Sequence, residues 1–287
     1  MTTIDRRAAL RTGAGLVAAG GLSAACTPSG AVPHPEHARA PGTPRTAGTP
    51  RTAGTQNPAG TPGAPGTPTS PAPSSTPGGP AAPRRFPGRP PQIEHGPRTR
   101  PRVALTFHGN GDPGTAHALL AEAERHGARL TVLAVGTWLD EHPALARRVL
   151  DGGHDLGNHT QHHVGVNDLP EREAYAEITD CAHRLTRLTG SIGTWFRPSR
   201  AARASPLVER LARRAGYPHV LSYDVDSLDF TEPGAAAVTR TVLDRIQPGS
   251  IVSLHFGYAD TVAALPAVLE ELDRRGLTAV TATELIR

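Results

Sequence analysis

Histidines are concentrated in GNHTQHH, the stretch that runs from Gly157 to His163. His159 and His163 are four positions apart, so both rings can reach one metal ion if the chain is helical or tightly turned there. We expect His162, which lies between them, to point elsewhere. A divalent metal ion held in this way activates water for hydrolysis. The pair is compatible with a metal site, but histidines also cap and fill loops, so the pair alone does not establish one.

A second polar stretch, LTFHGNGD, spans Leu105 to Asp112 and has the pattern of a buried strand that runs into a glycine-rich loop. It carries His108, Asn110 and Asp112. A histidine with an intrinsic pKa of about 6.5 suits proton transfer at neutral pH. A carboxylate can act as a base or bind a metal ion. The stretch is either a catalytic loop or the remains of one.

The elements that position these residues follow an alternating pattern from Arg102 onward. Apolar runs that predict strands cover 102–107, 129–136, 154–159, 194–199, 219–226, 250–256 and 278–286. Helical patterns cover 116–127, 142–153, 174–188, 206–216, 235–246 and 261–276. About seven βα repeats in so short a segment favour a small, distorted (β/α) barrel with a parallel sheet over an open sheet.

Most polar residues that could do chemistry lie at the carboxyl ends of these predicted strands. They are His108 to Asp112, His159 with His163, Arg197, Asp224 to Asp229, and His255. The carboxyl ends of the strands of a parallel barrel converge on one face, where active sites form. We therefore expect these side chains to meet in one site.

The stretch GGHDLGNHTQHH resembles the second motif of the polysaccharide deacetylases, the fourth carbohydrate esterase family, also called the NodB-homology domain. The segments FRPS, GYPHVLSYDVDSLDF and GSIVSLHF resemble later motifs of the family in the same order, so the resemblance covers essentially all of 102–287. It implies a hydrolase of amide bonds with a divalent metal, zinc or otherwise cobalt or another ion. His159 and His163 would be metal ligands. Arg197 would orient the catalytic acid, His255, whose ring Asp226 or Asp229 would hold.

The opening motif departs from the family pattern, which is Thr-Phe-Asp-Asp-Gly-Pro. His108 stands where the resemblance places the general base, and Gly109 stands where it places a metal-binding aspartate. Three hypotheses follow. Asp112 completes the metal site while His108 is the base; or His108 is the third ligand while Asp112 is the base; or the site is degenerate and only binds.

Other positions near the motifs also differ from the family. Arg200 replaces an aromatic residue and Ser253 replaces a leucine of the acetyl pocket. A backbone N–H near Ser199 or Arg200 would stabilise an oxyanion. We expect Trp138 and Trp195 to lie in the core. Cys181, within a predicted helix, is interpreted as a small buried apolar side chain.

The first hundred residues cannot build a core, because 20 of the 29 prolines lie at or before Pro101 among Gly, Thr, Ala and Ser. Residues 1–26 resemble a twin-arginine export signal, with Arg6 and Arg7, that ends in a lipoprotein site at Cys26. We predict a disordered linker over 27–100 and a catalytic domain over 101–287.

Charge divides unevenly along the chain. Up to Pro101 there are 11 arginines and 3 acidic residues, against 19 arginines and 23 acidic residues in the remainder. The basic tail is a solvated linker or contacts anionic polymers or lipid head groups. The acidic, aromatic-poor domain argues against nucleic-acid binding.

These observations lead to one functional prediction. We expect a monomeric, exported metal-dependent deacetylase, anchored to the membrane by an N-terminal lipid or secreted, that removes N-acetyl groups from a peptidoglycan-like or chitin-like envelope glycan. The alternatives are a non-catalytic glycan-binding module of the same fold and a hydrolase of non-sugar C–N bonds.

Overall fold

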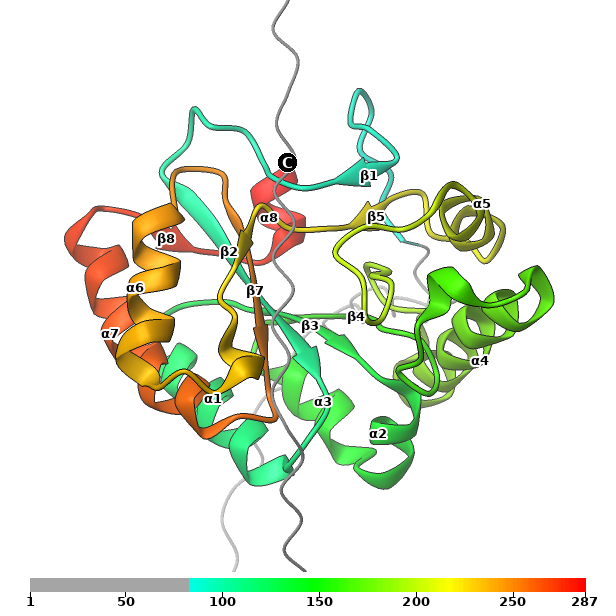
Figure 1. Cartoon of the computed structure of the whole chain (residues 1–287), viewed down its shortest axis with the longest axis horizontal. Helices are drawn as coiled ribbons and strands as arrows, with labels where there is room; N and C mark the ends of the chain where they lie inside the picture. The colour runs from blue at the N-terminus through cyan, green and yellow to red at the C-terminus, as the bar shows by residue number, and fades with distance from the viewer. Residues whose placement is uncertain (1–82) are drawn as a thin grey trace, which may run out of the picture. The chain divides into compact units, whose positions relative to one another are not determined.

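The computed structural model describes residues 83–287, which form one α/β unit around a parallel sheet (Figure 1). The predicted export signal and most of the predicted linker lie outside the described residues. The main sheet has the order β4-β3-β2-β7-β6, and β8 also pairs with β2. Its strands are β2 (Arg102–Gly109), β3 (Thr131–Ala134), β4 (Asp155–Asn158), β6 (Val225–Asp226), β7 (Ile251–His255) and β8 (Thr278–Ala279).

The sheet curves toward closure beyond β4. Phe196 forms parallel bridges to Asn158 and to Val220, and Val220 belongs to β5 (Val220–Leu221). Strand positions therefore continue from β4 through Phe196 to β5. This arrangement confirms the predicted α/β architecture, a small and distorted barrel whose strands are short away from the centre.

The central strand, β2, is buried on both faces of the sheet. Seven of its eight residues are buried, as expected for a Val-, Leu- and Phe-rich strand flanked by neighbours on either side. β2 is paired with β3 on one side and with β7 on the other. In the β2/β7 register, His108 lies opposite His255, so two histidines far apart in sequence end adjacent strands.

Helices cover the sheet, as Figure 1 shows. They are α1 (Pro113–Arg125), α2 (Gly136–Glu141), α3 (Ala144–Asp151), α4 (Glu171–Thr189), α5 (Pro206–Arg214), α6 (Ala235–Arg245), α7 (Ala259–Arg274) and α8 (Ala282–Ile286). Two 3-10 turns, η1 (Val166–Asp168) and η2 (Asp229–Thr231), lie in the connections. The helix expected over 142–153 is α3 alone; α2 precedes it and ends before Pro143.

Three predicted strands differ from the structure. The strand expected over 194–199 is reduced to the two bridges of Phe196. The strand expected over 219–226 is divided into β5 and β6. The strand expected over 278–286 ends after two residues and is followed by α8. Thr281 begins this helix with a capping box, because its hydroxyl accepts from the N–H of Glu284 while the Glu284 carboxylate accepts from the N–H of Thr281. This local capping outweighs the β-branched composition of the segment.

Residues 83–100 pack onto the domain, although the sequence pattern assigned them to the linker. β1 (Gln92–Ile93) pairs with β5, and Ile93 is 1% exposed. The ring of Phe86 stacks on Trp195, with centroids 5.3 Å apart. Phe86 and Ile93 belong to one buried cluster with Trp195, which the proline-rich composition of the segment did not indicate. The boundary predicted at residue 101 is therefore too late.

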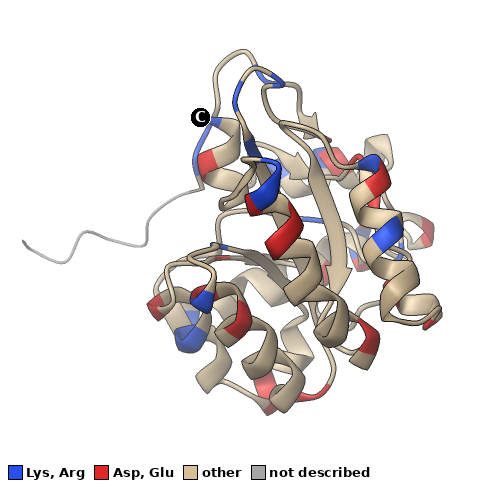
Figure 2. Ribbon diagram, turned by 90° about the vertical axis from the view of Figure 1, so that its left-hand side faces the viewer, with Lys and Arg blue, Asp and Glu red and all other residues tan. Residues whose placement is uncertain are grey.

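The surface carries both signs of charge. Figure 2 shows acidic and basic segments interspersed along the helices seen from this side. Among residues 83–287, none of the helices is both long enough and apolar enough to span a bilayer.

Candidate active site

The carboxyl ends of β2 and β7 open into a cavity of about 350 Å³. Its walls include His108, His163 and His255, which come from three separate segments. Asp226 and Tyr223 line it as well. The parallel register brings these polar groups to one edge of the sheet, as predicted from their positions after strands.

A chain of hydrogen bonds joins four side chains in this region. An N–H of Arg197 lies 3.2 Å from the Nε2 of His108, and the Nδ1 of His108 lies 2.8 Å from the Nε2 of His255. The Nδ1 of His255 lies 2.6 Å from an oxygen of Asp229. Because a guanidinium can only donate, the Nε2 of His108 must accept, so His108 donates from Nδ1 to His255 and His255 donates from Nδ1 to Asp229. The partners thereby determine both tautomers.

Asp229 holds the position of His255. The carboxylate is fully buried and accepts from the backbone N–H of His255 at 2.8 Å and from the Thr261 hydroxyl at 2.6 Å. Burial acts to raise the pKa of Asp229, but the hydrogen bonds from His255 and Thr261 outweigh it, and the pKa is lowered. Of the two aspartates expected at this ring, Asp229 is the one in contact with it; Asp226 instead accepts from the N–H of Leu228 at 3.1 Å.

Arg197 is fully buried behind the cavity. Its guanidinium donates to the carbonyls of Leu221 at 2.9 Å and Ser222 at 3.1 Å, besides its contact with His108. Burial lowers its pKa to about 10, which leaves it charged at neutral pH. Arg197 was expected to orient the catalytic acid, and its guanidinium contacts His108, which in turn contacts His255.

The Nε2 of His159 is free to bind a ligand. Its Nδ1 donates to the carbonyl of Arg197 at 3.0 Å, so its Nε2 carries an unshared electron pair. That Nε2 is buried and has no hydrogen-bond partner among the described residues. Its ring stacks on His108 with centroids 4.2 Å apart, and burial, with the neighbouring His163, lowers its pKa well below the usual value. A buried, neutral and unpaired imidazole nitrogen suits a metal ion.

His163 lies beside His159 with ring centroids 5.1 Å apart. A left-handed backbone, with φ of 56°, aims its side chain back into the cavity. Burial, followed by the nearby Arg200, lowers its pKa. His162 points elsewhere, as expected, and its Nδ1 pairs with Glu177 at 2.6 Å.

The structure leaves Asp112 outside this cavity. Asp112 is exposed and is the N-cap of α1, where its carboxylate accepts from the N–H of Thr115 at 3.0 Å. An N-cap aspartate is occupied by the first turn of its helix. The two hypotheses that gave Asp112 a role as ligand or base both require it to leave that position.

Gly109 is enclosed by neighbours. A Cβ at this position would lie 3.0 Å from Val132, 3.1 Å from the Cα of Ala134 and 3.2 Å from the Trp138 ring. A side chain here therefore requires these groups to move. The metal-binding aspartate that the resemblance places at this position cannot be introduced without repacking.

The remaining expectations for buried residues agree with the structure. Trp138 and Trp195 are 3% and 1% exposed, and Trp138 donates to the carbonyl of Gly111 at 2.8 Å, which fixes the loop after β2. Cys181 is fully buried, and burial raises its pKa to about 12. The cysteine is therefore an unreactive core residue.

Three aromatic side chains of the cavity were not singled out from the sequence. Tyr223, Phe230 and Tyr258 line it, and the rings of Phe230 and Tyr258 have centroids 5.5 Å and 5.8 Å from that of His255. Phe230 is 45% exposed, so it forms an apolar rim. Their positions in the sequence could have indicated them. Tyr223 and Phe230 lie close to Asp229, and Tyr258 lies three residues after His255. Arg200 and Ser253 also line the cavity.

The described residues provide two of the side-chain ligands that a metal ion needs, and not a third. Within residues 83–287, no three His, Cys, Asp or Glu side chains are grouped to hold a metal ion. Both nitrogens of His108 are used in hydrogen bonds, and Asp112 caps a helix. The unpaired Nε2 of His159 together with His163 fits a two-histidine site, in which water or substrate supplies the other ligands.

Comparisons with known proteins agree with this arrangement. The sequence model of the family described as Polysaccharide deacetylase matches residues 95–220. The peptidoglycan-N-acetylglucosamine deacetylase of Bacillus cereus is 31% identical over 195 residues, which are 67% of this chain and 91% of that protein. The enzyme of that name in Listeria monocytogenes is 29% identical over 188 residues, or 66% of this chain, and the match spans 39% of the Listeria protein.

A solved structure supports the fold. A CE4 family pseudoenzyme from Bacillus anthracis superposes with a TM-score of 0.65 at 22% identity, over 69% of this chain and 70% of that one. The shared parallel sheet, the order of motifs and the sequence match to the Bacillus cereus enzyme lead to the same assignment. The chain belongs to the polysaccharide deacetylase family.

Proposed function

We propose that this protein is a hydrolase that removes N-acetyl groups from a cell-envelope glycan. The observation that carries the proposal is the His255–Asp229 pair at the wall of the cavity, with His108 hydrogen-bonded to its outer nitrogen. A histidine held by a buried carboxylate is a proton carrier of the kind that amide hydrolysis requires. Family membership supports the substrate class.

The proton passes through His255. It donates its Nδ1–H to Asp229, so its Nε2 carries no proton and accepts the hydrogen bond from His108 at the wall of the cavity. The hydrogen bond from His108 must break before this nitrogen can take a proton. As the oxygen of a water molecule bonds to the amide carbon, its proton then moves to this Nε2, and Asp229 stabilises the imidazolium. The same nitrogen returns the proton to the departing amine as the C–N bond breaks, leaving acetate and a free sugar amine.

His108 is a positioning residue in this scheme. Burial, followed by the charges of His159 and His255, lowers the pKa of His108 well below its usual value, and Arg197 also contributes to this shift. It therefore stays neutral and donates from Nδ1 toward His255. Arg197 determines which tautomer it takes. This assignment differs from both hypotheses that made His108 a base or a ligand.

His159 and His163 would hold a divalent ion, zinc or cobalt among the options, through the unpaired Nε2 of His159 and the adjacent ring of His163. When bound, such an ion acidifies water and polarises the amide carbonyl. The backbone N–H of Arg200, at the edge of the cavity, is the proposed donor to the oxyanion. The aromatic rim at Phe230 and Tyr258 gives the sugar an apolar face to lie against.

The proposed location is the outer face of the cell membrane. The Arg6-Arg7 signal and Cys26 support export and lipid attachment, and the proline-rich segment that follows would give the domain reach to nearby wall polymer. A peptidoglycan-like glycan is therefore the preferred substrate, with a chitin-like glycan as the other option. We propose that the protein acts as a monomer.

The test measures acetate release and metal content on the full chain with N-acetylated glycan oligomers. His255→Ala should lower turnover by about a hundredfold or more while metal content stays unchanged. His159→Ala should lose metal. Asp112→Ala is the matched control: as an exposed cap it should retain both metal and turnover. Loss of turnover or of metal in Asp112→Ala would instead make Asp112 a base or a ligand and contradict the scheme in which His255 alone carries the proton.

A second function is favoured by one observation, the lack of a three-donor metal site among the described residues. A non-catalytic glycan-binding module of this fold needs neither a base nor a third ligand. Saturable binding of oligomers with no acetate released, even with added zinc or cobalt, would establish that function instead.

A further inference from the structure

A second cavity lies at the opposite end of the strands from the histidines. It has a volume of about 320 Å³ and lies beside Asp155, the first residue of β4, whereas His159 follows the last. The usual rise per residue separates the two positions by about 13 Å along the strand. Pro83, Arg84, Gly153, Asp155, Ser191, Gly193, Thr194, Thr281, Thr283, Glu284 and Arg287 line it. None of these residues takes part in the proposed deacetylation.

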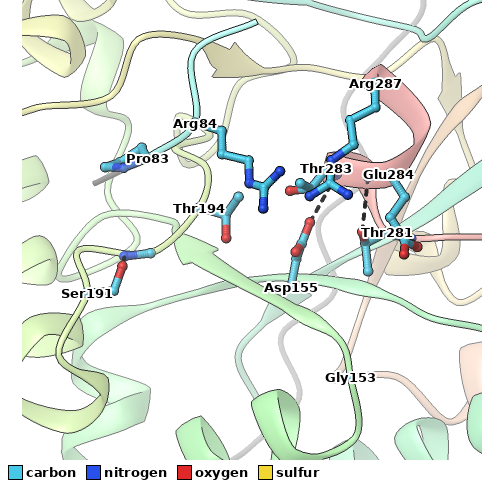
Figure 3. A pocket seen from close by; sticks show the side chains of 11 residues that line it. Pro83, Arg84, Gly153, Asp155, Ser191, Thr194, Thr281, Thr283, Glu284 and Arg287 are labelled. Carbon is cyan, nitrogen blue, oxygen red and sulfur yellow. Dashed lines mark hydrogen bonds between the residues drawn. The ribbon is translucent and has the colours of Figure 1, made fainter. Parts of the chain in front are cut away.

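Two arginines face each other across this cavity. Figure 3 shows the side chains of Arg84 and Arg287 pointing toward one another, with Asp155 and Thr194 alongside. Neither guanidinium forms an ion pair or a hydrogen bond with any other residue of the described part of the chain. Two like charges directed into one space repel each other unless an anion lies between them.

The acidic residues of the cavity offset the charge of these arginines only in part. Glu284 is paired with Arg129 at 2.7 Å. Asp155 accepts from the N–H of Thr283 at 3.1 Å and forms no ion pair within the described residues. Outside the Glu284–Arg129 pair, two arginine side chains stand against the one carboxylate of Asp155, so one net positive charge is left for a ligand.

Hydroxyl groups complete the lining. The Oγ1 of Thr283 accepts from the Nε1 of Trp195 at 3.1 Å, and the Thr283 hydroxyl is itself hydrogen-bonded to the Asp155 carboxylate. The Thr194 side chain lies beside the arginines. The cavity is also at the lower limit of small-molecule pockets, about 300 Å³, and so exceeds what a bare oxyanion needs.

We propose that this cavity binds the phosphate ester of a sugar or polyol. The two guanidinium groups match the several terminal oxygens of a phosphate from opposite sides, and the hydroxyl of Thr194 can bond to the hydroxyl-rich body of the ligand. The ester is either a small metabolite or a unit of a phosphate-containing envelope polymer. This site is independent of the deacetylation proposed above.

The experiment uses the full chain and follows binding by calorimetry and by fluorescence, because Trp195 contacts Thr283 in the cavity wall. The probes are glycerol 3-phosphate, glucose 6-phosphate, inorganic phosphate, glucose and poly(glycerol phosphate). We expect both esters to bind at one site per chain, more tightly than inorganic phosphate, and glucose not to bind. Tighter binding of the polymer per phosphate identifies the polymer as the source, and equal or weaker binding identifies the small ester.

Matched arginine variants test the site itself. Arg84→Gln and Arg287→Gln should each weaken ester binding at least tenfold, about 1.4 kcal/mol. Arg85→Gln, next in sequence to Arg84 but outside the cavity, should bind as the wild type does. All three should keep the wild-type melting temperature and, because they lie apart from the histidines, the wild-type acetate release.

Several results would overturn the site. They are no ester binding, equal binding of glucose, inorganic phosphate binding as tightly as the esters, or equal weakening by Arg85→Gln. Because binding here requires no turnover, these results are distinct from a failure of deacetylation.

Discussion

At the scale of single residues, the hydrogen-bonding capacity of each side chain determines the direction of the hydrogen bonds in the site. Arg197 can only donate, so His108 must accept from it and donate onward to His255. Asp229 accepts the last hydrogen bond of the series. The sequence indicated that these residues would meet, but only their contacts assign the order and place Asp229, not Asp226, at the ring.

The charge of Asp229 should contribute to stability in a pH-dependent way. Its pKa is lowered in the fold from an unfolded value of about 3.9. A lowered pKa means that the stabilisation is fully present above the unfolded value and is lost as the pH falls through the folded value. Urea unfolding of wild type and Asp229→Asn should therefore show a constant stability difference from pH 7 to about 5, which shrinks below about 4.

The control for this titration is Asp244→Asn. Asp244 is exposed on α6 and should show little difference from wild type at any pH in the series. A gap between wild type and Asp229→Asn that stays constant down to pH 3 would contradict the assigned role of the carboxylate.

Cys181 should be chemically silent in the folded protein. Burial raises its pKa to about 12, so almost no thiolate exists at pH 8, and no part of the side chain is exposed. In a Cys26→Ser background, a thiol reagent at pH 8 should react with the unfolded protein and not with the native one. Rapid labelling under native conditions would show that the helix carrying Cys181 opens locally.

At the scale of elements, close backbone approach shapes the cavity. The loop between β2 and α1 contacts the loop after β7, where a Cβ on Gly111 would lie 2.5 Å from the Cα of Gly257. Gly111 also has φ of 109°, which favours glycine. Both glycines line a further space of about 250 Å³ with His108, His163 and His255. The glycines in HGNGD therefore allow two loops to meet beside the histidines.

Gly111→Ala tests this packing. The strained backbone and the clash with Gly257 should together cost roughly 1–3 kcal/mol or more and lower the melting temperature. Gly127→Ala is the matched control, because Gly127 has φ of 65° with no atom within 4 Å of the added Cβ, so it carries backbone strain alone. Equal melting temperatures for the two variants would show that the loops separate easily.

Element prediction succeeded where periodicity was strong and failed where local contacts decided. The alternating βα pattern identified the central strands and the long helices, because burial on both sides of β2 and β7 demands apolar runs. The segment 278–286 was expected as a strand, yet the Thr281 capping box turns its second half into α8. Asp112 looked catalytic by type, whereas its position before Pro113 makes it a helix cap.

At the scale of the whole molecule, the domain begins earlier than its composition suggests. Phe86 stacks on Trp195, whose indole is hydrogen-bonded to Thr283, and Ile93 packs in the same core cluster. The segment 83–100 therefore joins β5 and the end of the chain into one packed layer.

Removing this contact should destabilise the domain. Phe86→Ala in the full chain is expected to cost about 3 kcal/mol, the lower part of the range for a buried aromatic. Phe86→Leu, which keeps most of the apolar volume, should cost less. Urea unfolding measures both, and a Phe86→Ala protein as stable as wild type would contradict the view that this segment is part of the domain.

The sequence by itself determined the family, the α/β class and the polar residues that gather at the strand ends, because motif order and hydrophobic period are local properties of the chain. Tertiary structure alone decided that both nitrogens of His108 are occupied, that the Nε2 of His159 is left unpaired, and that Gly109 is closed off by Trp138. Each of these depends on contacts between segments far apart in sequence, in register across a sheet. Spacing along one strand carries no information about such contacts.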